Sequence, residues 1–298
     1  MNPVAGRKTL GRLSRPSAVL AVRDALAEAS IDAAVVETSG PDDAVELARR
    51  AVAEGRPLVI TAGGDGTVED VLQPLVGTST ALGILPLGSA MNLARSLGIP
   101  RDLADAARVI SHGKVLAADI GRVGDGPYFV EAAGVGLDPV LLADWVRDRG
   151  QGARVRQTIA WLRNAEPVQV AIRADGQDEV IVRSLLVRVA NSPYFGLGSM
   201  LAPGVRIDDG RLRLLVYRDW GVRDLARYQL ASLVTKHWPL PVESEPSFVR
   251  SVDIAVLGNR RLPVHADGKF VTTTPVRLSI VPAGLRVVAG PAAGAAEQ

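Results

Sequence analysis

The chain has 298 residues, which is enough for two domains that each have a core of their own. Its 34 Lys and Arg nearly balance its 32 Asp and Glu, so the charge does not support binding to nucleic acid, which requires basic residues clustered on one face. The absence of cysteine excludes disulfides, thiolate metal sites and cysteine nucleophiles. No apolar run is long enough to span a membrane, since Arg183 and Arg188 interrupt the longest one, and no signal peptide is visible. We therefore expect a cytoplasmic protein.

The first 113 residues alternate between helical and strand patterns. Apolar residues at helical spacing predict helices at 13–29, 41–53, 68–75, 90–97 and 102–112, and short apolar runs predict strands at 33–38, 58–62 and 81–85. This alternation is typical of a doubly wound parallel α/β domain, which we assign to residues 1–113.

From Lys114 onward the pattern changes to strands joined by turns. We expect strands at 115–123, 128–135, 168–174, 180–191, 212–217, 251–256 and 276–281, and helices at 140–163 and 222–235. This order predicts an antiparallel β-sandwich-like domain over residues 114–284. Residues 285–298 are expected to return to the first domain and to end in a disordered tail rich in Ala and Gly.

The most informative stretch is 58–100, where two predicted strands each run through a short turn into a helix. The first turn reads Gly63-Gly64-Asp65-Gly66-Thr67, and the second contains Gly88 and Ser89. Strand, glycine turn and helix form a context in which backbone N–H groups and a helix N-terminus bind phosphate. Asp65 would repel phosphate, which suggests a metal ion or a water between the two. A tight turn and an ordinary helix cap remain the alternative, but two such turns in tandem favour a phosphate site.

These motifs resemble the diacylglycerol kinase catalytic-domain family, and in particular the bacterial soluble lipid kinases, which are similar to sphingosine and ceramide kinases and have an NAD kinase-like fold. The resemblance is carried by NPVAG at 2–6, GGDGT at 63–67 and LPLGSAMNLARSLGIP at 85–100. It implies a nucleotide-binding α/β domain, a lipid-substrate β domain, ATP as co-substrate and Mg²⁺ as cofactor. The family has a strand before the first motif, and because Met1 directly precedes Asn2, we expect this strand to be missing.

The resemblance also implies roles for individual residues. It places ATP contacts at Asn2, Thr38, Gly63, Gly64, Asp65, Gly66, Thr67, Asp70 and Ser89. It makes Asp267, in a segment similar to the family's DGE, the base for the acceptor hydroxyl, and it makes Asp65 the second catalytic residue. From the residues alone, Asp267-Gly268 reads as a common hairpin turn, and only the family resemblance reverses that interpretation.

Two further segments have a functional and a plainer interpretation. The resemblance implies a structural Mg²⁺ held by Asp209 and the backbone carbonyls of Arg206 and Arg211, and oxygen ligands suit this ion. A hairpin turn at Asp209-Gly210 is the alternative. The arginines and tryptophans of 145–163 are compatible with an anionic membrane surface, but the acidic residues among them favour a solvated helix face. The three histidines have no metal-ligand spacing and are expected to be structural.

The chain departs from the family pattern at a few positions. Asp70 and Ser89 keep the chemistry of the residues that they replace, whereas Met91 and Lys269 do not, and Glu131 stands where Asn is common. We therefore expect an ATP-dependent kinase that phosphorylates a lipid hydroxyl at a membrane surface. The sequence leaves open whether the protein forms a homodimer. The alternatives are an NAD kinase-like enzyme and a catalytically weak protein that binds nucleotide or lipid.

Overall fold

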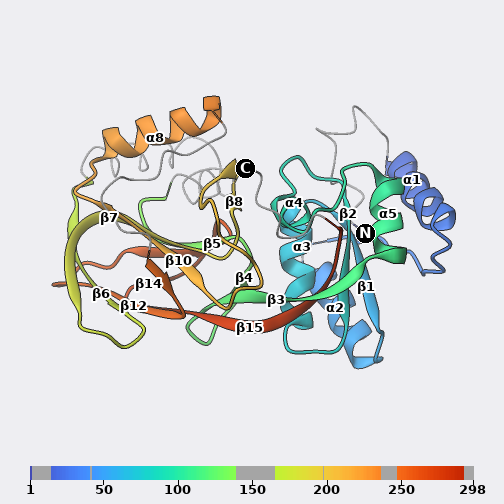
Figure 1. Cartoon of the computed structure of the whole chain (residues 1–298), viewed down its shortest axis with the longest axis horizontal. Coiled ribbons are helices and arrows are strands. Elements are labelled where there is room, and N and C mark those ends of the chain that lie inside the picture. Colours follow the sequence, from blue (N-terminus) through green and yellow to red (C-terminus); the bar gives the residue numbers. More distant parts are fainter. Residues whose placement is uncertain (2–14, 41, 139–164, 197, 236–246, 292–298) are drawn as a thin grey trace. The chain divides into compact units, whose positions relative to one another are not determined.

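The computed structural model describes residues 1, 15–40, 42–138, 165–196, 198–235 and 247–291. The chain forms two compact units (Figure 1). Unit 1 consists of Met1–Asp119 and Pro282–Gln298, and unit 2 consists of Ile120–Val281. No helix of the described residues is long and apolar enough to cross a membrane.

Unit 1 is built on parallel strands with helices packed against them. Its elements in order are α1 (Arg15–Glu28), α2 (Asp43–Ala53), β1 (Leu58–Gly63), α3 (Asp65–Leu72), η1 (Gln73–Leu75), β2 (Ala81–Pro86), α4 (Asn92–Ser96) and α5 (Leu103–His112). β1 pairs in parallel with β2, and β15 (Val276–Ala289) reaches unit 1 to pair in parallel with the other edge of β2 through Val287 and Leu82. Every residue of β2 is buried, as expected for a strand covered on both faces. The described part of 282–298 therefore belongs to unit 1 together with the first 119 residues.

Local signals explain where the helices of unit 1 begin and end. The carboxylate of Asp102 accepts the N–H of Asp105 at 3.0 Å and so caps α5, whose buried face is Ala106, Ala107 and Ile110. The predicted helix at 90–97 shortens to α4 because Met91 adopts the left-handed conformation, with φ of 53°.

The predicted strand at 33–38 is wrong. This segment belongs to no helix or strand, and most of its residues are exposed. The Met1 amino group donates to Val36 O at 2.8 Å, and Thr38 N–H donates to Met1 O at 2.9 Å. An apolar composition alone does not make a strand, because a strand also needs a neighbour along its length.

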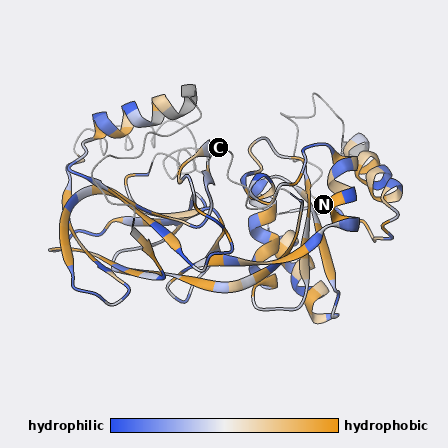
Figure 2. Ribbon diagram, in the orientation of Figure 1, coloured by the Kyte–Doolittle hydropathy of each residue, from blue (hydrophilic) through white to orange (hydrophobic). Residues whose placement is uncertain are grey.

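Unit 2 is an antiparallel β unit, which confirms the predicted fold class. Its strands are β3 (Lys114–Val123, which begins in unit 1), β4 (Tyr128–Phe129), β5 (Ala132–Gly136), β6 (Val168–Ala174), β7 (Val180–Ala190), β8 (Tyr194–Phe195), β9 (Ser199–Met200), β10 (Leu212–Arg218), β11 (Ser247–Val249), β12 (Ser251–Val256), β13 (Pro263–Ala266) and β14 (Lys269–Thr273). The strands follow the order β15-β12-β6-β7-β5-β13-β14, and β10 also pairs with β7. The long strands are mainly hydrophobic with hydrophilic residues interspersed (Figure 2), and Ser184–Ala190 of β7 are all buried.

The predicted helix at 222–235 is present as α8 (Val222–Thr235), and it contributes to the core of unit 2. Leu225 and Tyr228 of this helix are buried together with Phe195, Leu215 and Tyr217. The predicted helix at 140–163, with its arginines and tryptophans, and most of the predicted tail lie outside the described residues.

The predicted strand at 128–135 is interrupted for a reason that lies far along the chain. It divides into β4 and β5 because the N–H groups of Val130, Glu131 and Ala132 all donate to the carboxylate of Asp267, at 2.8–2.9 Å. A side chain from the turn between β13 and β14 therefore accepts the N–H groups at the point where β4 and β5 separate.

Candidate functional site

Two turns follow β1 and β2 at the same edge of the parallel sheet. The register pairs Gly63 with Pro86, and the N–H of Leu87 donates to Gly63 O at 2.9 Å. The carboxylate of Asp65 then accepts the N–H of Met91 at 2.9 Å and that of Asn92 at 2.8 Å. Asp65 thus ties the glycine turn to the start of α4, and the structure brings the two predicted turns together.

The glycines of the first turn are not all explained by packing. A Cβ at Gly63 would lie 2.6 Å from Thr67 Cβ, and one at Gly88 would lie 2.7 Å from Gly64 Cα, so these two positions must be small. A Cβ at Gly64 would meet only Gly88 Cα, at an ordinary 3.6 Å, and one at Gly66 would meet nothing within 4 Å. Neither Gly64 nor Gly66 has a positive φ. Glycine at these two positions therefore serves neither the packing nor the backbone conformation of the chain.

The backbone at this turn also presents hydrogen-bond donors. Gly64 is the N-cap of α3 and contributes no side-chain cap. The N–H groups of Asp65 and Gly66 have no acceptor among the described residues, whereas those of Thr67 and Val68 donate to Gly64 O. A helix N-terminus with exposed N–H groups and no Cβ in the way can bind an anion.

Polar side chains surround the second turn. Ser89 is exposed, and Asp70 is half-buried on α3. The guanidinium of Arg101 donates to the carbonyls of Gly88, at 3.2 Å, and of Ser89. Arg101 places a positive charge at this turn, and sequence reasoning missed it because it lies beyond the motif and carries no spacing signal.

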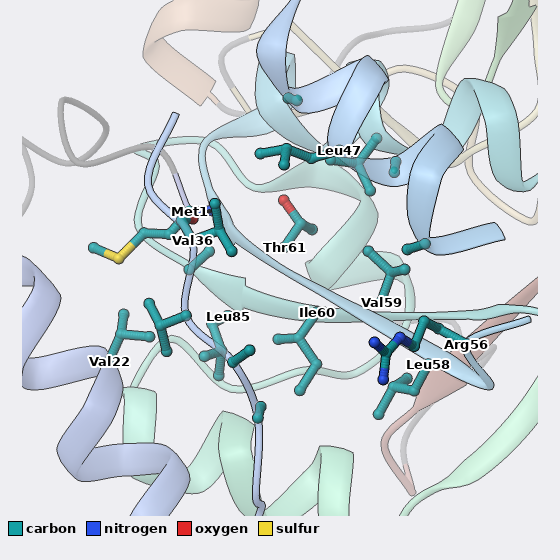
Figure 3. A pocket seen from close by; sticks show the side chains of 18 of the residues that line it. Met1, Val22, Val36, Leu47, Arg56, Leu58, Val59, Ile60, Thr61 and Leu85 are labelled. Carbon is teal, nitrogen blue, oxygen red and sulfur yellow. Dashed lines mark hydrogen bonds between the residues drawn. The ribbon is translucent and has the colours of Figure 1, made fainter. Parts of the chain in front are cut away.

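A cavity of about 610 Å³ lies beside β1 in unit 1 (Figure 3). Its walls are mostly apolar and come from α1, α2, β1 and the irregular segment 31–38. Thr38 and Thr67, both predicted to contact ATP, line this cavity, as does Thr61. The side-chain hydroxyl of Thr38 donates to Met1 O at 3.3 Å. Asn2, the remaining predicted ATP contact, lies outside the described residues.

In unit 2, Asp267 lies at the tip of the hairpin between β13 and β14. Asp267 and Gly268 have φ values of 46° and 86°, which are typical of a type I′ turn. Asp267 Oδ1 accepts the N–H groups of Glu131 and Ala132, and Oδ2 accepts that of Val130. Burial raises the pKa of Asp267 to about 6, although these three donors and His265 act to lower it.

Three fully buried polar side chains lie next to this hairpin. Arg188 donates from Nε to Asp138 Oδ2 at 2.6 Å and from Nη2 to Asp138 Oδ1 at 2.9 Å. His265 Nε2 lies 3.0 Å from Asp138 Oδ2, at an angle that departs from a regular hydrogen bond. Burial acts to raise the pKa of Asp138, but the charge of Arg188 and then His265 outweigh it and hold this pKa well below its usual range.

The segment predicted to hold a structural Mg²⁺ forms an exposed turn. Asp209 Oδ1 accepts the N–H of Arg211 at 3.0 Å, and the guanidinium of Arg206 pairs with Asp208 at 2.9 Å. Among the described residues, no three His, Asp or Glu side chains form a group that could hold a metal ion. Ligation by one carboxylate and two carbonyls at Asp209, Arg206 and Arg211 stays a prediction.

A parallel α/β unit with a glycine turn at its strand ends, joined to an antiparallel β unit, defines the two-unit fold of lipid kinases and NAD kinases. The family model described as "Diacylglycerol kinase catalytic domain" matches residues 1–123. The model described as "YegS C-terminal NAD kinase beta sandwich-like domain" matches residues 144–289. The chain belongs to the diacylglycerol kinase catalytic-domain family.

Individual proteins agree with this assignment. A diacylglycerol kinase of Mycobacterium tuberculosis (strain CDC 1551 / Oshkosh) is 31% identical over 264 residues, which cover 85% of this chain and 84% of the relative. The crystal structure of a diacylglycerol kinase from Bacillus anthracis str. Sterne has a TM-score of 0.73 at 24% identity, covering 98% of this chain and 96% of that one. An NAD kinase from Archaeoglobus fulgidus in complex with ATP has a TM-score of 0.52 at 16% identity, covering 90% and 87%. The last two similarities show the fold.

Proposed function

We propose that this protein is an ATP-dependent kinase that transfers the γ-phosphate to a hydroxyl group of a lipid of the diacylglycerol class. The observation that carries this proposal is the open backbone at Gly64 and Gly66. A phosphate oxygen that approaches the N–H groups of Asp65 and Gly66 needs the space that a Cβ would fill. Family membership supports a lipid acceptor, and the ATP complex of an NAD kinase with this fold supports ATP as the donor.

Phosphoryl transfer from ATP also needs a divalent cation, and Asp65 fits Mg²⁺. Each oxygen of this carboxylate accepts one backbone N–H and retains a lone pair for the ion or for water bound to it. Asp65 would hold the cation from the first turn of α3. When bound, the ion neutralises charge on the phosphates.

We assign the general base to Asp267. Because Oδ1 accepts two N–H groups and Oδ2 only one, Oδ2 retains the lone pair that can take a proton. In the reaction the acceptor O–H bond breaks and its proton moves to Oδ2. The acceptor oxygen forms a bond to the γ-phosphorus, and the bond between that phosphorus and ADP breaks. A pKa of about 6 leaves the carboxylate deprotonated at neutral pH and still basic.

The chain offers a matched control for this assignment. Asp175-Gly176 is a second Asp-Gly turn between strands, with φ values of 48° and 72°. The carboxylate of Asp175 accepts the N–H groups of Arg250 and Ser251, both at 2.8 Å. The two aspartates therefore hold their turns in the same way, and they differ in their surroundings.

The experiment measures transfer of radiolabelled phosphate from ATP to diacylglycerol in mixed micelles, with NAD as a parallel acceptor. We expect Asp267→Asn to lower lipid phosphorylation by roughly 10²–10⁴, and Asp175→Asn to leave it unchanged at equal folded protein. Equal effects of the two substitutions on lipid phosphorylation would show that Asp267 serves only the structure of the hairpin. Labelling of NAD in place of lipid would identify an NAD kinase, and labelling of neither would leave a binding protein.

A further inference from the structure

The Asp267 turn differs from the Asp175 turn in what lies two residues before the aspartate. At the Asp175 turn this residue is Arg173, which is exposed and lies 3.7 Å from Glu179. At the Asp267 turn it is His265, which is fully buried. The Asp-Gly turn at Asp175, which lies in a longer connection between β6 and β7, therefore forms without a buried histidine two residues before its aspartate, and His265 needs another explanation.

His265 contacts the hairpin and the buried ion pair with its two ring nitrogens. The N–H of Gly268, the second residue of the turn, donates to His265 Nδ1 at 3.3 Å. Since Nδ1 accepts, the proton of the neutral ring is on Nε2, which lies 3.0 Å from Asp138 Oδ2. The ring also stacks on Phe195, with centroids 5.8 Å apart. A Cβ at Gly134 would lie 2.1 Å from Nε2, so the neighbouring strand leaves room for this ring orientation.

The buried ion pair with Arg188 holds Asp138 in the position from which its carboxylate contacts the His265 ring. Arg188 binds both oxygens of Asp138, and its Nη1 donates to the hydroxyl of Tyr217 at 3.1 Å. Replacing such a buried pair by apolar residues is often neutral or stabilising, so stability alone does not account for it. A buried network of hydrogen-bonded polar groups does, however, hold its side chains in one defined arrangement.

We infer that His265, held by the Asp138–Arg188 pair, is a positioning residue that orients the hairpin tip and hence the carboxylate of Asp267. This inference rests on the proposed function only for the role of Asp267 as the base. His265 acts through its Nδ1 contact with the Gly268 N–H, and the contact with Asp138 sets the tautomer that makes Nδ1 an acceptor.

Two amide substitutions separate the two ring contacts. In His265→Asn the side-chain oxygen can take the place of Nδ1 and accept the Gly268 N–H, and the contact with Asp138 is lost. In His265→Gln the longer side chain can reach Asp138 in place of Nε2, and the acceptor for Gly268 is lost. Both variants remove the ring that stacks on Phe195, so this loss is common to them.

The first measurement is lipid phosphorylation at equal folded protein, checked by thermal unfolding. We expect His265→Gln to lower kcat by roughly 10- to 100-fold, the cost of misplacing a reacting group by about 1 Å, with the KM for ATP unchanged. His265→Asn should keep most of the turnover. Equal losses in both variants, no loss in either, or the reverse order would overturn the inference. If His265→Gln does not fold, His265→Ala is assayed with and without imidazole, and a lack of rescue overturns it.

The second measurement does not depend on activity. The amide NMR signals of Val130, Glu131 and Ala132 report the charge of Asp267, because these amides donate to its carboxylate. We expect their pH titration to change in His265→Gln and to be retained in His265→Asn. Unchanged titrations in both variants would overturn the positioning role. A wild-type protein that phosphorylates no lipid would refute the proposed function, and the NMR titration would then decide the positioning role alone.

Discussion

Substitution of Gly66 by alanine should separate stability from nucleotide binding. Gly66 lies in the first turn of α3, has no positive φ, and leaves open space around an added Cβ. Alanine in place of glycine in a helix gains about 0.5–1 kcal/mol of stability, so the free energy of unfolding should rise by up to this amount. The same methyl group would stand where the proposal places a phosphate oxygen. Loss of one charge-assisted hydrogen bond costs about 1.5–3 kcal/mol, or roughly a 10- to 150-fold weaker affinity for ATP.

The assay combines urea unfolding with calorimetric titration of ATP in the presence of Mg²⁺. Gly40→Ala is the matched control, because a Cβ at Gly40 also meets nothing within 4 Å and its φ is not positive. The control should bind ATP as the wild type does. A Gly66→Ala protein that is more stable and binds ATP normally would refute the phosphate site, and a destabilised one would refute the open space at Gly66.

Three further outcomes are expected. Asp65→Asn should lower the free energy of unfolding by about 1–3 kcal/mol, because an amide has one acceptor oxygen for the N–H groups of Met91 and Asn92; a thermal melt checks this. Asp138→Asn should lower the free energy of unfolding by about 3–5 kcal/mol, because the buried charge of Arg188 loses its partner. Urea unfolding measures this loss. The pKa of Asp267 is raised to about 6, so the folded state binds this proton more tightly than the unfolded state does. The contribution of Asp267 to the free energy of unfolding should therefore decrease as the pH rises from about 4 to about 6. That slope should be absent in Asp267→Asn, and lipid phosphorylation should rise through pH 6 as the base loses its proton.

Local patterns were enough to predict the parts of the fold that depend on neighbouring residues. The apolar runs of β1 and β2 and the periodicity of α5 and α8 each reflect burial of one short segment. The glycine turn was visible for the same reason, because its residues are contiguous. These elements and the fold class could therefore be read from the residues.

Features that depend on distant residues could not be predicted in this way. The break between β4 and β5 is caused by Asp267, more than a hundred positions along the chain. In the sequence Arg188 interrupts an apolar run, yet it is fully buried because Asp138, 50 positions away, neutralises it. His265 carried no spacing signal, since Asp138 and Phe195, which contact its ring, lie far away in the sequence. Three-dimensional proximity, which no local pattern encodes, decides each of these positions.

The strand β15 has a consequence for how the protein is made. Most of unit 1 precedes unit 2 in the chain, but its sheet includes residues near 287, which pair with Leu82. The same segment accepts the N–H of Gly77 at Gly284 O, and its Ala283 N–H donates to Asp119. During synthesis the sheet of unit 1 therefore cannot close until the residues near 287 have been made, and such long-range parallel pairing folds slowly. A fragment that ends after α5 should expose the uncovered edge of β2 and depend on chaperones or aggregate.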